Sequence, residues 1–322
     1  MTNGIRVHRT GGPEVLEWEQ IDLPEPGPGQ VRLAHSAIGL NFIDVYHRTG
    51  LYPQPLPFVP GVEAAGRIEA VGSDVAGLQV GDRVAYVLQI GAYAEERVVA
   101  AERLVKVPDG IEDRIAAASL LKGLTARYLL RRTYRVEAGD TILVHAAAGG
   151  VGLILCQWAK QLGATVIGTV STEEKAELSR AHGCDHPLIS GAVDLVEAVR
   201  EITAGEGVPV VYDSIGRDTF QSSLDCLRPF GTMVLYGQSS GAVAPIDPNI
   251  LQKGSLFLTR PTLATHGAKR EDLVEGADEL FEMLLAGNVR VSVNQSFPLR
   301  EAGEAHRQLE ARKTTGSSIL LP

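Results

Sequence analysis

The stretch His145–Gly152 (HAAAGGVG) places three alanines and two adjacent glycines between two apolar runs that must pack. Side chains this small allow another group to approach the backbone closely. A strand, a small-residue turn and a helix form a site for the pyrophosphate of a dinucleotide, because the helix N-terminus presents free N–H groups and a partial positive charge. The pattern G-x-G-x-x-G appears here with alanine at its first position, and a tight turn without a ligand remains the alternative. The candidate phosphate-binding residues are Ala148, Gly149, Gly150, Val151 and Gly152.

The residues after the second strand indicate which dinucleotide this would be. An NAD site has an acidic residue there, about 20 residues after the glycines, to hold the ribose 2′-hydroxyl. This chain has the hydroxyls of Ser171 and Thr172 instead, and Lys175 follows one helical turn later. One charge-assisted hydrogen bond to a 2′-phosphate contributes about 1.5–3 kcal/mol, or roughly 10- to 150-fold in cofactor preference. The pattern favours NADPH, with a solvated lysine beside Glu173 and Glu174 as the alternative.

The predicted elements supply the framework for these residues. Roughly the first 120 residues contain short apolar runs between Gly, Pro and Asp clusters, which indicates a β-rich region. From Thr141 onward, strands alternate with helices, which is typical of βαβ units and a parallel sheet. The tail adds two helices and a last strand that we expect to return to the first region. The predicted strands are 141–145, 164–169, 208–213, 232–236, 255–259 and 318–322, and the predicted helices are 151–162, 173–182, 194–203, 218–227, 271–286 and 300–312.

The composition limits the class of protein. The chain has 322 residues, is 44% hydrophobic and 21% charged, and carries a net charge of −9. This acidic balance argues against nucleic-acid binding, since phosphate backbones attract basic surfaces. We expect neither a membrane span nor a secretory leader, because no apolar run is long enough and the N-terminus lacks an apolar signal core. Cys156, Cys184 and Cys226 form no CxxC pair, which indicates reduced thiols and a cytoplasmic protein.

Motifs spread over essentially the whole chain share one family pattern. They are Gly39–Asp44, Pro60–Gly66, Lys122–Thr125, Gly139–Lys160, Tyr212–Gly216 and Thr314–Ser318. On these motifs the sequence resembles the quinone oxidoreductase/zeta-crystallin group, the zinc-free NADPH:quinone reductase branch of the medium-chain dehydrogenase/reductase superfamily.

The resemblance implies an α/β fold with two domains and a cleft between them. A Rossmann domain with a doubly wound parallel sheet, residues 123–264, would bind NADPH. It would be inserted in a GroES-like β-rich catalytic domain, residues 1–122 plus 265–322. The resemblance also implies a homodimer joined through Rossmann edge strands, for which 255–259 is the candidate.

In this family a lysine, an aromatic residue or histidine, and a C-terminal arginine hold the 2′-phosphate. Lys175 and Arg312 fall at two of the matching positions. Ser190 stands at the remaining position, where its hydroxyl could still bind the phosphate.

The resemblance further indicates that Asn41–Tyr52 is the active-site segment. Asn41 would bind the cofactor or an acceptor oxygen, and Tyr46 and Tyr52 would stack on a flat ring or donate phenolic hydrogen bonds. A packed loop with exposed hydroxyls is the alternative for the tyrosines, and we expect Asp44 to be structural. The catalytic candidates are therefore Asn41, Tyr46 and Tyr52, and further cofactor contacts are expected from Asn41, Tyr46, Thr125, Ser214, Tyr236, Gly237, Gln238, Ser239 and Arg260.

The sequence lacks the ligands of a catalytic zinc. Zinc-dependent relatives use a cysteine and a Gly-His-Glu motif, and the corresponding places here carry Asn41 and Gly61-Val62-Glu63. Catalytic zinc needs three protein ligands, so we expect a metal-free enzyme. His182–His186 (HGCDH) contains metal-ligating residue types, but it lies between a helix and a strand, and we interpret it as a polar turn.

Without a metal, the hydride would come from C4 of the nicotinamide, while the protein aligns the acceptor and excludes water. A quinone suits this chemistry because its reduction gives a stable aromatic diolate and needs little acid catalysis. We therefore predict the NADPH-dependent reduction of small quinones. Two alternatives remain: reduction of activated C=C bonds in alkenals or enones, and a non-catalytic protein that binds NADPH or RNA.

Overall fold

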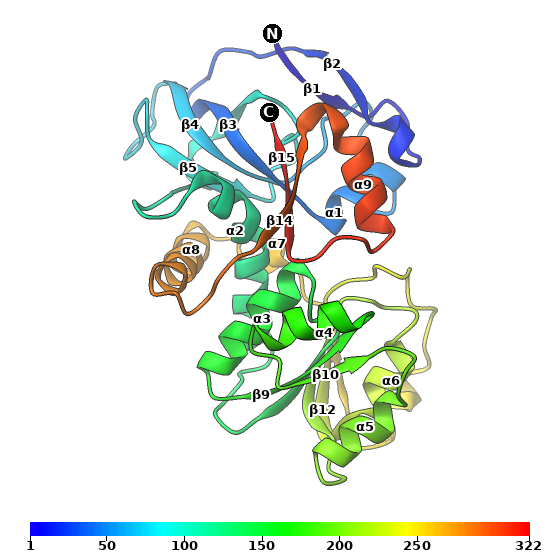
Figure 1. Cartoon of the computed structure of the whole chain (residues 1–322). Coiled ribbons are helices and arrows are strands. Elements are labelled where there is room, and N and C mark those ends of the chain that lie inside the picture. The colour runs from blue at the N-terminus through cyan, green and yellow to red at the C-terminus, as the bar shows by residue number, and fades with distance from the viewer. The chain divides into compact units, whose positions relative to one another are not determined.

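The computed structural model describes residues 1–322, which form two compact units (Figure 1). The first unit comprises Met1–Lys122, Lys269–Leu285 and Val291–Pro322. The second comprises Gly123–Ala268 and Ala286–Arg290. Each unit builds its own hydrophobic core on its own main sheet.

A seven-stranded sheet organises the first unit. Its strand order is β14-β15-β3-β4-β5-β7, and β6 also pairs with β3. Because β15 pairs antiparallel with β3, the end of the chain returns to the N-terminal sheet. The strands are β3 (Gln30–Leu40), β4 (Glu63–Val71), β5 (Arg83–Val87), β6 (Glu96–Ala100), β7 (Leu104–Lys106), β14 (Val293–Pro298) and β15 (Ser317–Leu321), beside a small sheet of β1 (Thr2–Arg6) and β2 (Glu17–Ile21).

Alternating residues along β3 build the core of this unit. Val31 and Leu33 are fully buried while Gln30 is exposed, as the two-residue period of a strand requires. Ala302 and Ala305 of α9 belong to the same core cluster, so α9 packs its small residues on the sheet. The helices of the unit are α1 (Phe42–Thr49), α8 (Arg270–Leu285) and α9 (Ala302–Glu310), together with the first part of α2 (Asp113–Tyr128).

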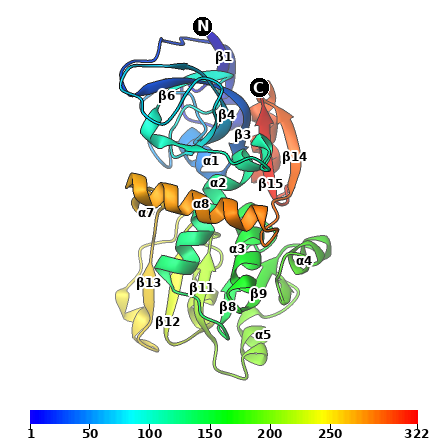
Figure 2. The ribbon, with the colours of Figure 1, turned by 90° about the vertical axis from the view of Figure 1, so that its left-hand side faces the viewer.

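A six-stranded parallel sheet organises the second unit, with the order β10-β9-β8-β11-β12-β13. Figure 2 shows β13, β12, β11, β8 and β9 side by side. The chain runs outward from β8 in one direction and then outward from β11 in the other, so the order reverses between these two strands. Such a switch point is where doubly wound sheets bind ligands. The strands are β8 (Thr141–Val144), β9 (Thr165–Val170), β10 (His186–Ile189), β11 (Val208–Asp213), β12 (Leu227–Leu235) and β13 (Phe257–Thr259), and the helices are α3 (Gly150–Gln161), α4 (Glu173–Arg180), α5 (Leu195–Ile202), α6 (Phe220–Asp225) and α7 (Leu263–His266).

The fold matches the predicted α/β class, with a doubly wound parallel sheet in one unit and a mostly antiparallel sheet in the other, and it differs at several element boundaries. β13 begins at Phe257 instead of residue 255, because Ser255 adopts the left-handed conformation with φ 52. α6 begins at Phe220 instead of residue 218, because the chain after β11 first turns around the Asp213 carboxylate.

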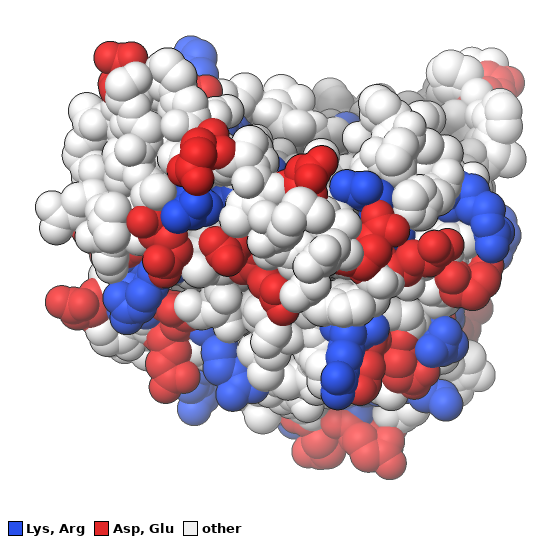
Figure 3. Space-filling view, turned by 90° about the horizontal axis from the view of Figure 1, so that it is seen from above, with Lys and Arg blue, Asp and Glu red and all other residues white.

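No helix of the structure is both long and apolar enough to cross a membrane. On the face shown in Figure 3, acidic and basic side chains are interspersed without a large region of one sign.

Candidate active site

The turn between β8 and α3 leaves almost no room for side chains. Gly149 precedes α3 in extended conformation, with φ −80 and ψ 171. A Cβ added at Gly152 would lie 2.3 Å from the carbonyl oxygen of Ala146, and Ala147 is fully buried. The small residues are therefore required by the packing of α3 against the turn that precedes it.

The first turn of α3 differs from those of its neighbours in its electrostatics. It carries neither an acidic residue nor a side chain that caps the helix. In contrast, the Thr172 side chain accepts a hydrogen bond at the start of α4, and Asp194 does so for α5. The first N–H groups of a helix lack partners within the helix and carry a positive potential. The N-terminus of α3 therefore fits an anion such as a pyrophosphate.

The parallel strand order brings the other candidate residues of the second unit to the same sheet edge. Parallel strands end on the same side, so residues that directly follow them gather there. The main-chain N–H of Ser190 donates to the carbonyl of Val170 at 2.8 Å, which holds the end of β10 beside that of β9. This edge collects Ser171, Thr172, Lys175, Ser190, Ser214, Tyr236, Gly237, Gln238, Ser239 and Arg260.

The residues at the end of β9 suit a phosphorylated ribose. The Oγ1 of Thr172 accepts from the main-chain N–H of Lys175 at 3.3 Å, so Thr172 caps α4 and Lys175 lies in its first turn. No carboxylate directly follows β9, where an NAD site would need one. The bare turn, the open helix terminus and this lysine together fit NADPH.

A buried polar network beneath this edge is not predicted from the sequence. The Oδ2 of Asp213 accepts from the hydroxyls of Thr219 and Ser223 at 2.7 Å each, and Ser223 lies 3.0 Å from the Nε2 of His145. These are residue types of a hydrolytic triad, but Ser223 donates to Asp213, not to His145. Burial lowers the pKa of His145. His145, Asp213 and Ser223 are buried and Thr219 is partly buried, so we interpret the network as a support of the β8–α3 turn.

Two further contacts after β12 and β13 are also missed by sequence reasoning. The rings of Tyr128 and His266 stack with centroids 4.4 Å apart and an interplanar angle of 4°. The Nη1 of Arg260 donates to the carbonyl of Leu235, the last residue of β12, at 3.1 Å. Burial raises the pKa of Tyr236, so its phenol stays protonated near neutral pH.

Tyr46 and Tyr52 form an aromatic pair at α1 in the first unit. Their rings meet edge to face with centroids 5.1 Å apart, and the N–H of Tyr52 donates to the carbonyl of Tyr46 at 3.0 Å. Gly50 directly follows α1, and its φ of 82 lets the chain reverse toward Tyr52. Both tyrosines are partly exposed, so the pair offers ring surface to a planar molecule.

Asp44 occupies a structural position within α1, as the sequence indicates. Its Oδ2 accepts from the main-chain N–H of Asn41 at 2.9 Å and from the hydroxyl of Tyr93 at 3.0 Å. Burial raises the pKa of the Asp44 carboxyl to about 7, although both hydrogen bonds act in the opposite direction. The side chain fixes the start of α1, where Asn41 lies.

The Asn41 side chain is held between two opposite charges. Its Nδ2 donates to the Oε2 of Glu63 at 2.9 Å, and its Oδ1 accepts from the Nζ of Lys122 at 2.8 Å. All three residues are buried. The sequence motifs include Lys122 and Glu63, but nothing in their spacing predicts this contact.

Of the remaining candidates, Thr125 lies on α2 and Arg312 follows the end of α9. Thr125 is buried on α2, three residues after Lys122. Arg312 follows α9 in the left-handed conformation with φ 58, and Glu310 just before it binds Arg48 of α1 through both carboxylate oxygens. Asn41, Tyr46, Tyr52 and Arg312 thus belong to the first unit, and all other candidates belong to the second.

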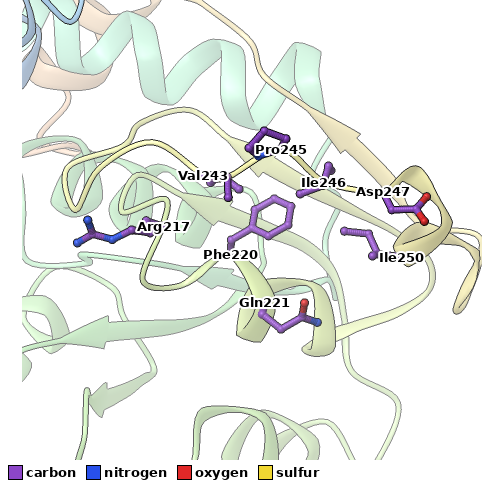
Figure 4. A pocket seen from close by; sticks show the side chains of 9 residues that line it. Arg217, Phe220, Gln221, Val243, Pro245, Ile246, Asp247 and Ile250 are labelled. Atoms are coloured by element: carbon purple, nitrogen blue, oxygen red, sulfur yellow. The ribbon is translucent and has the colours of Figure 1, made fainter.

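A surface pocket of about 380 Å³ lies in the second unit. Figure 4 shows Phe220 at its centre, with Arg217 toward one end and Asp247 toward the other. Val243 and Ile246 add apolar surface from the segment that follows β12. None of the predicted site residues lines this pocket.

Three residues of the HGCDH segment, His182, Cys184 and Asp185, make contacts with neighbouring helices and strands. The Nδ1 of His182 donates to the carbonyl of Leu178 at 2.8 Å, and Asp185 accepts from Lys160 at 2.8 Å. The Sγ of Cys184 lies 3.7 Å from the carbonyl of Val166. These contacts link the turn to α4, α3 and β9.

Comparison with known proteins agrees with this architecture. Residues 27–109 match the family model described as alcohol dehydrogenase GroES-like domain, and residues 150–280 match the one described as zinc-binding dehydrogenase. A quinone oxidoreductase of Pseudomonas aeruginosa is 53% identical, with 100% of both chains covered. A 2-haloacrylate reductase of a Burkholderia species is 50% identical, with 98% of both chains covered. The structure of Escherichia coli quinone oxidoreductase complexed with NADPH has a TM-score of 0.97 at 48% identity, covering 99% of this chain and 100% of that one.

A GroES-like unit joined to a Rossmann-type unit defines a medium-chain dehydrogenase/reductase. Within that superfamily, the chain belongs to the quinone oxidoreductase family.

The description of the second matched model raises the question of zinc, and the residues do not fit this metal. A catalytic zinc site needs three protein ligands, usually thiolate, imidazole or carboxylate. The groups of this kind that contact Asn41 are the carboxylates of Glu63 and Asp44, and Asp44 already accepts hydrogen bonds from Asn41 and Tyr93. Position 62 is a valine. The ammonium of Lys122 already lies 3.4 Å from the Oε2 of Glu63, and a second cation there would be repelled.

Proposed function

We propose that the chain catalyses the NADPH-dependent reduction of quinones. The observation that carries this proposal is the uncapped N-terminus of α3, behind a bare turn and beside the lysine-bearing start of α4. The quinone oxidoreductase of Pseudomonas aeruginosa and the NADPH complex of the Escherichia coli protein support the reaction and the cofactor.

In this proposal the main chain of Ala148–Gly152 binds the pyrophosphate and the end of β9 binds the phosphorylated ribose. Bound NADPH supplies a hydride from its nicotinamide ring. Ser171, Thr172, Lys175, Ser190 and Arg312 hold the 2′-phosphate, and Thr125, Ser214, Tyr236, Gly237, Gln238, Ser239 and Arg260 contact the rest of the molecule.

The acceptor would be oriented by Asn41, Tyr46 and Tyr52. The edge-to-face tyrosine pair supplies partly exposed ring surface on which a planar quinone can stack. A quinone needs little proton donation during hydride transfer, because its reduced form is an aromatic diolate. This agrees with the segment Asn41–Tyr52, whose single carboxyl, Asp44, accepts hydrogen bonds from Asn41 and Tyr93.

A second candidate is the reduction of activated C=C bonds, favoured by the 50% identity to a 2-haloacrylate reductase. Steady-state rates with NADPH on 1,4-benzoquinone, 9,10-phenanthrenequinone, a 2-alkenal and 2-chloroacrylate separate the two. We expect the highest kcat/KM with a quinone, and no loss of rate after incubation with a chelator. Turnover of the alkenal or chloroacrylate alone would show that the quinone assignment is wrong.

We propose that the chain forms a homodimer through β13. This edge strand has a chain neighbour only in β12, and Phe257 on it is 59% exposed. Phe230, whose N–H binds Gly254 just before β13, is 72% exposed. Pairing the β13 strands of two copies would satisfy the open edge and cover both rings. Sedimentation velocity should give twice the 34.4 kDa chain mass, whereas a monomer at micromolar concentration would contradict this assembly.

The substitution Lys175→Ala tests the role of Lys175 at the 2′-phosphate. Loss of one charge-assisted hydrogen bond should raise the KM for NADPH by about tenfold or more. The KM for NADH should stay within about twofold, because NADH lacks the phosphate. Lys253→Ala is the control, since Lys253 lies in the same unit and is paired with Asp225 on the surface. Equal effects of Lys175→Ala on both cofactors would contradict the assignment.

A further inference from the structure

A buried ion pair lies against the side chain of Asn41 in the first unit. Glu63 is fully buried, and Lys122 is 5% exposed. The main-chain N–H of Leu121 donates to the other oxygen of Glu63, Oε1, at 2.6 Å. A Cβ at Gly39 would lie 2.2 Å from the Oε2 of Glu63, so the glycine makes room for the carboxylate. The main chain at Gly39 and Leu121 therefore accommodates the carboxylate of Glu63.

The two charges determine which way the Asn41 carboxamide faces. Its oxygen meets the ammonium of Lys122, and its nitrogen meets the carboxylate of Glu63. Turning the amide by 180° would set its N–H groups against the ammonium and its oxygen against the carboxylate. An ammonium can only donate and an ionised carboxylate can only accept, so the turned amide would lose both hydrogen bonds.

The main chain of Asn41 is fixed by a second chain of buried hydrogen bonds. The guanidinium of Arg48 can only donate, so the Nδ1 of His306, 3.1 Å away, is the acceptor. The Nε2 of His306 therefore carries the proton and donates to the hydroxyl of Tyr93 at 3.0 Å. Tyr93 in turn donates to Asp44, whose Oδ2 accepts the N–H of Asn41.

With these contacts made, the Asn41 side chain can only accept a hydrogen bond from a bound molecule. Both hydrogens of Nδ2 face protein oxygens, at 2.9 Å to Glu63 and 3.4 Å to the carbonyl of Gly39. The Oδ1 has two lone pairs, and Lys122 uses one of them. The second lone pair can accept a hydrogen bond from an N–H or O–H group of a bound molecule.

We propose that Lys122 and Glu63 are positioning residues of the reductase site, which hold the Asn41 carboxamide so that it acts as a hydrogen-bond acceptor. This inference rests on the proposed function and refines the role of Asn41 within it. An asparagine that only accepts selects for a donor on its ligand, such as a carboxamide, and does not bind a quinone oxygen, which can only accept. Of the two roles expected for Asn41, the hydrogen bonds of its side chain therefore favour the contact with the cofactor over one with a quinone oxygen. Lys122 acts here through Asn41 and not by contact with the substrate.

A mutant cycle on kcat tests the positioning role. Lys122→Met combined with Glu63→Gln removes both charges and leaves no unpaired charge buried. We expect this double variant and Asn41→Ala each to lower kcat with a quinone by about tenfold or more, the value of one well-placed hydrogen bond. The triple variant should be no slower than Asn41→Ala alone, because the pair acts through Asn41.

Two comparisons make the kinetic result decisive. Lys122→Arg keeps a charged donor and should retain more of kcat than Lys122→Met. The pair of the exposed Lys106 and the partly buried Asp82, neutralised as Lys106→Met with Asp82→Asn, should leave kcat unchanged. Wild-type kcat in the Lys122/Glu63 double variant, or losses that multiply in the triple variant, would overturn the proposal.

A spectroscopic measurement separates this inference from the proposed function. It requires neither enzyme activity nor the Lys122→Met variant. Side-chain amide signals are recorded with [¹⁵N]asparagine, and the Asn41 signal is assigned by its loss in Asn41→Ala. The signal should shift in Lys122→Arg and in Glu63→Gln, whether or not the wild type reduces quinones. An unchanged Asn41 signal in both variants would contradict the orientation by Lys122 and Glu63. The asparagines that contribute signals are Asn3, Asn41, Asn249, Asn288 and Asn294.

Discussion

The close approach of α3 to the turn that precedes it is the constraint on which the nucleotide-binding unit depends. A side chain at Gly152 would collide with the carbonyl of Ala146, so this position of the first turn of α3 must be a glycine. The same absence of side chains exposes the N–H groups of this turn and keeps their positive potential uncompensated. Packing and phosphate recognition therefore impose the same requirement on the same residues. The parallel sheet then determines which other residues can share the site, because it brings the ends of all six strands to one edge.

Each unit also buries a charge, and the partners of that charge determine what it does. Asp213 is surrounded by hydroxyl and main-chain donors, so its carboxylate ties the segment after β11 to the base of the β8–α3 turn. Glu63 is paired with an ammonium and an amide instead. The ammonium of Lys122 balances the charge of the Glu63 carboxylate, and this carboxylate also accepts a hydrogen bond that orients the side chain of Asn41. Lys122 thus places a buried positive charge beside Asn41 and Glu63.

The sequence predicts the features that depend on local chain properties. The βαβ alternation and the glycine turn predict the parallel sheet and the α3 terminus, because each leaves a periodic or compositional signal. The contact of Lys122 with Glu63 and Asn41 could not be predicted, since it joins residues from three separate segments. α6 starts late because the main chain after β11 hydrogen-bonds to the carboxylate of Asp213. β13 starts late because Ser255 adopts the left-handed conformation. The helix and strand propensities of these residues predict neither feature. The assignment of individual site residues to the cofactor stays a prediction.

We propose that the main-chain N–H groups at the start of α3 bind the pyrophosphate of NADPH. The most direct measurement is a ¹H–¹⁵N NMR titration of the uniformly labelled chain with NADPH. We expect saturable binding with large shifts of the Gly150, Val151 and Gly152 amide signals, in the direction of stronger hydrogen bonding. NADPH binding that leaves these three signals in place, or no saturable binding at all, would contradict it.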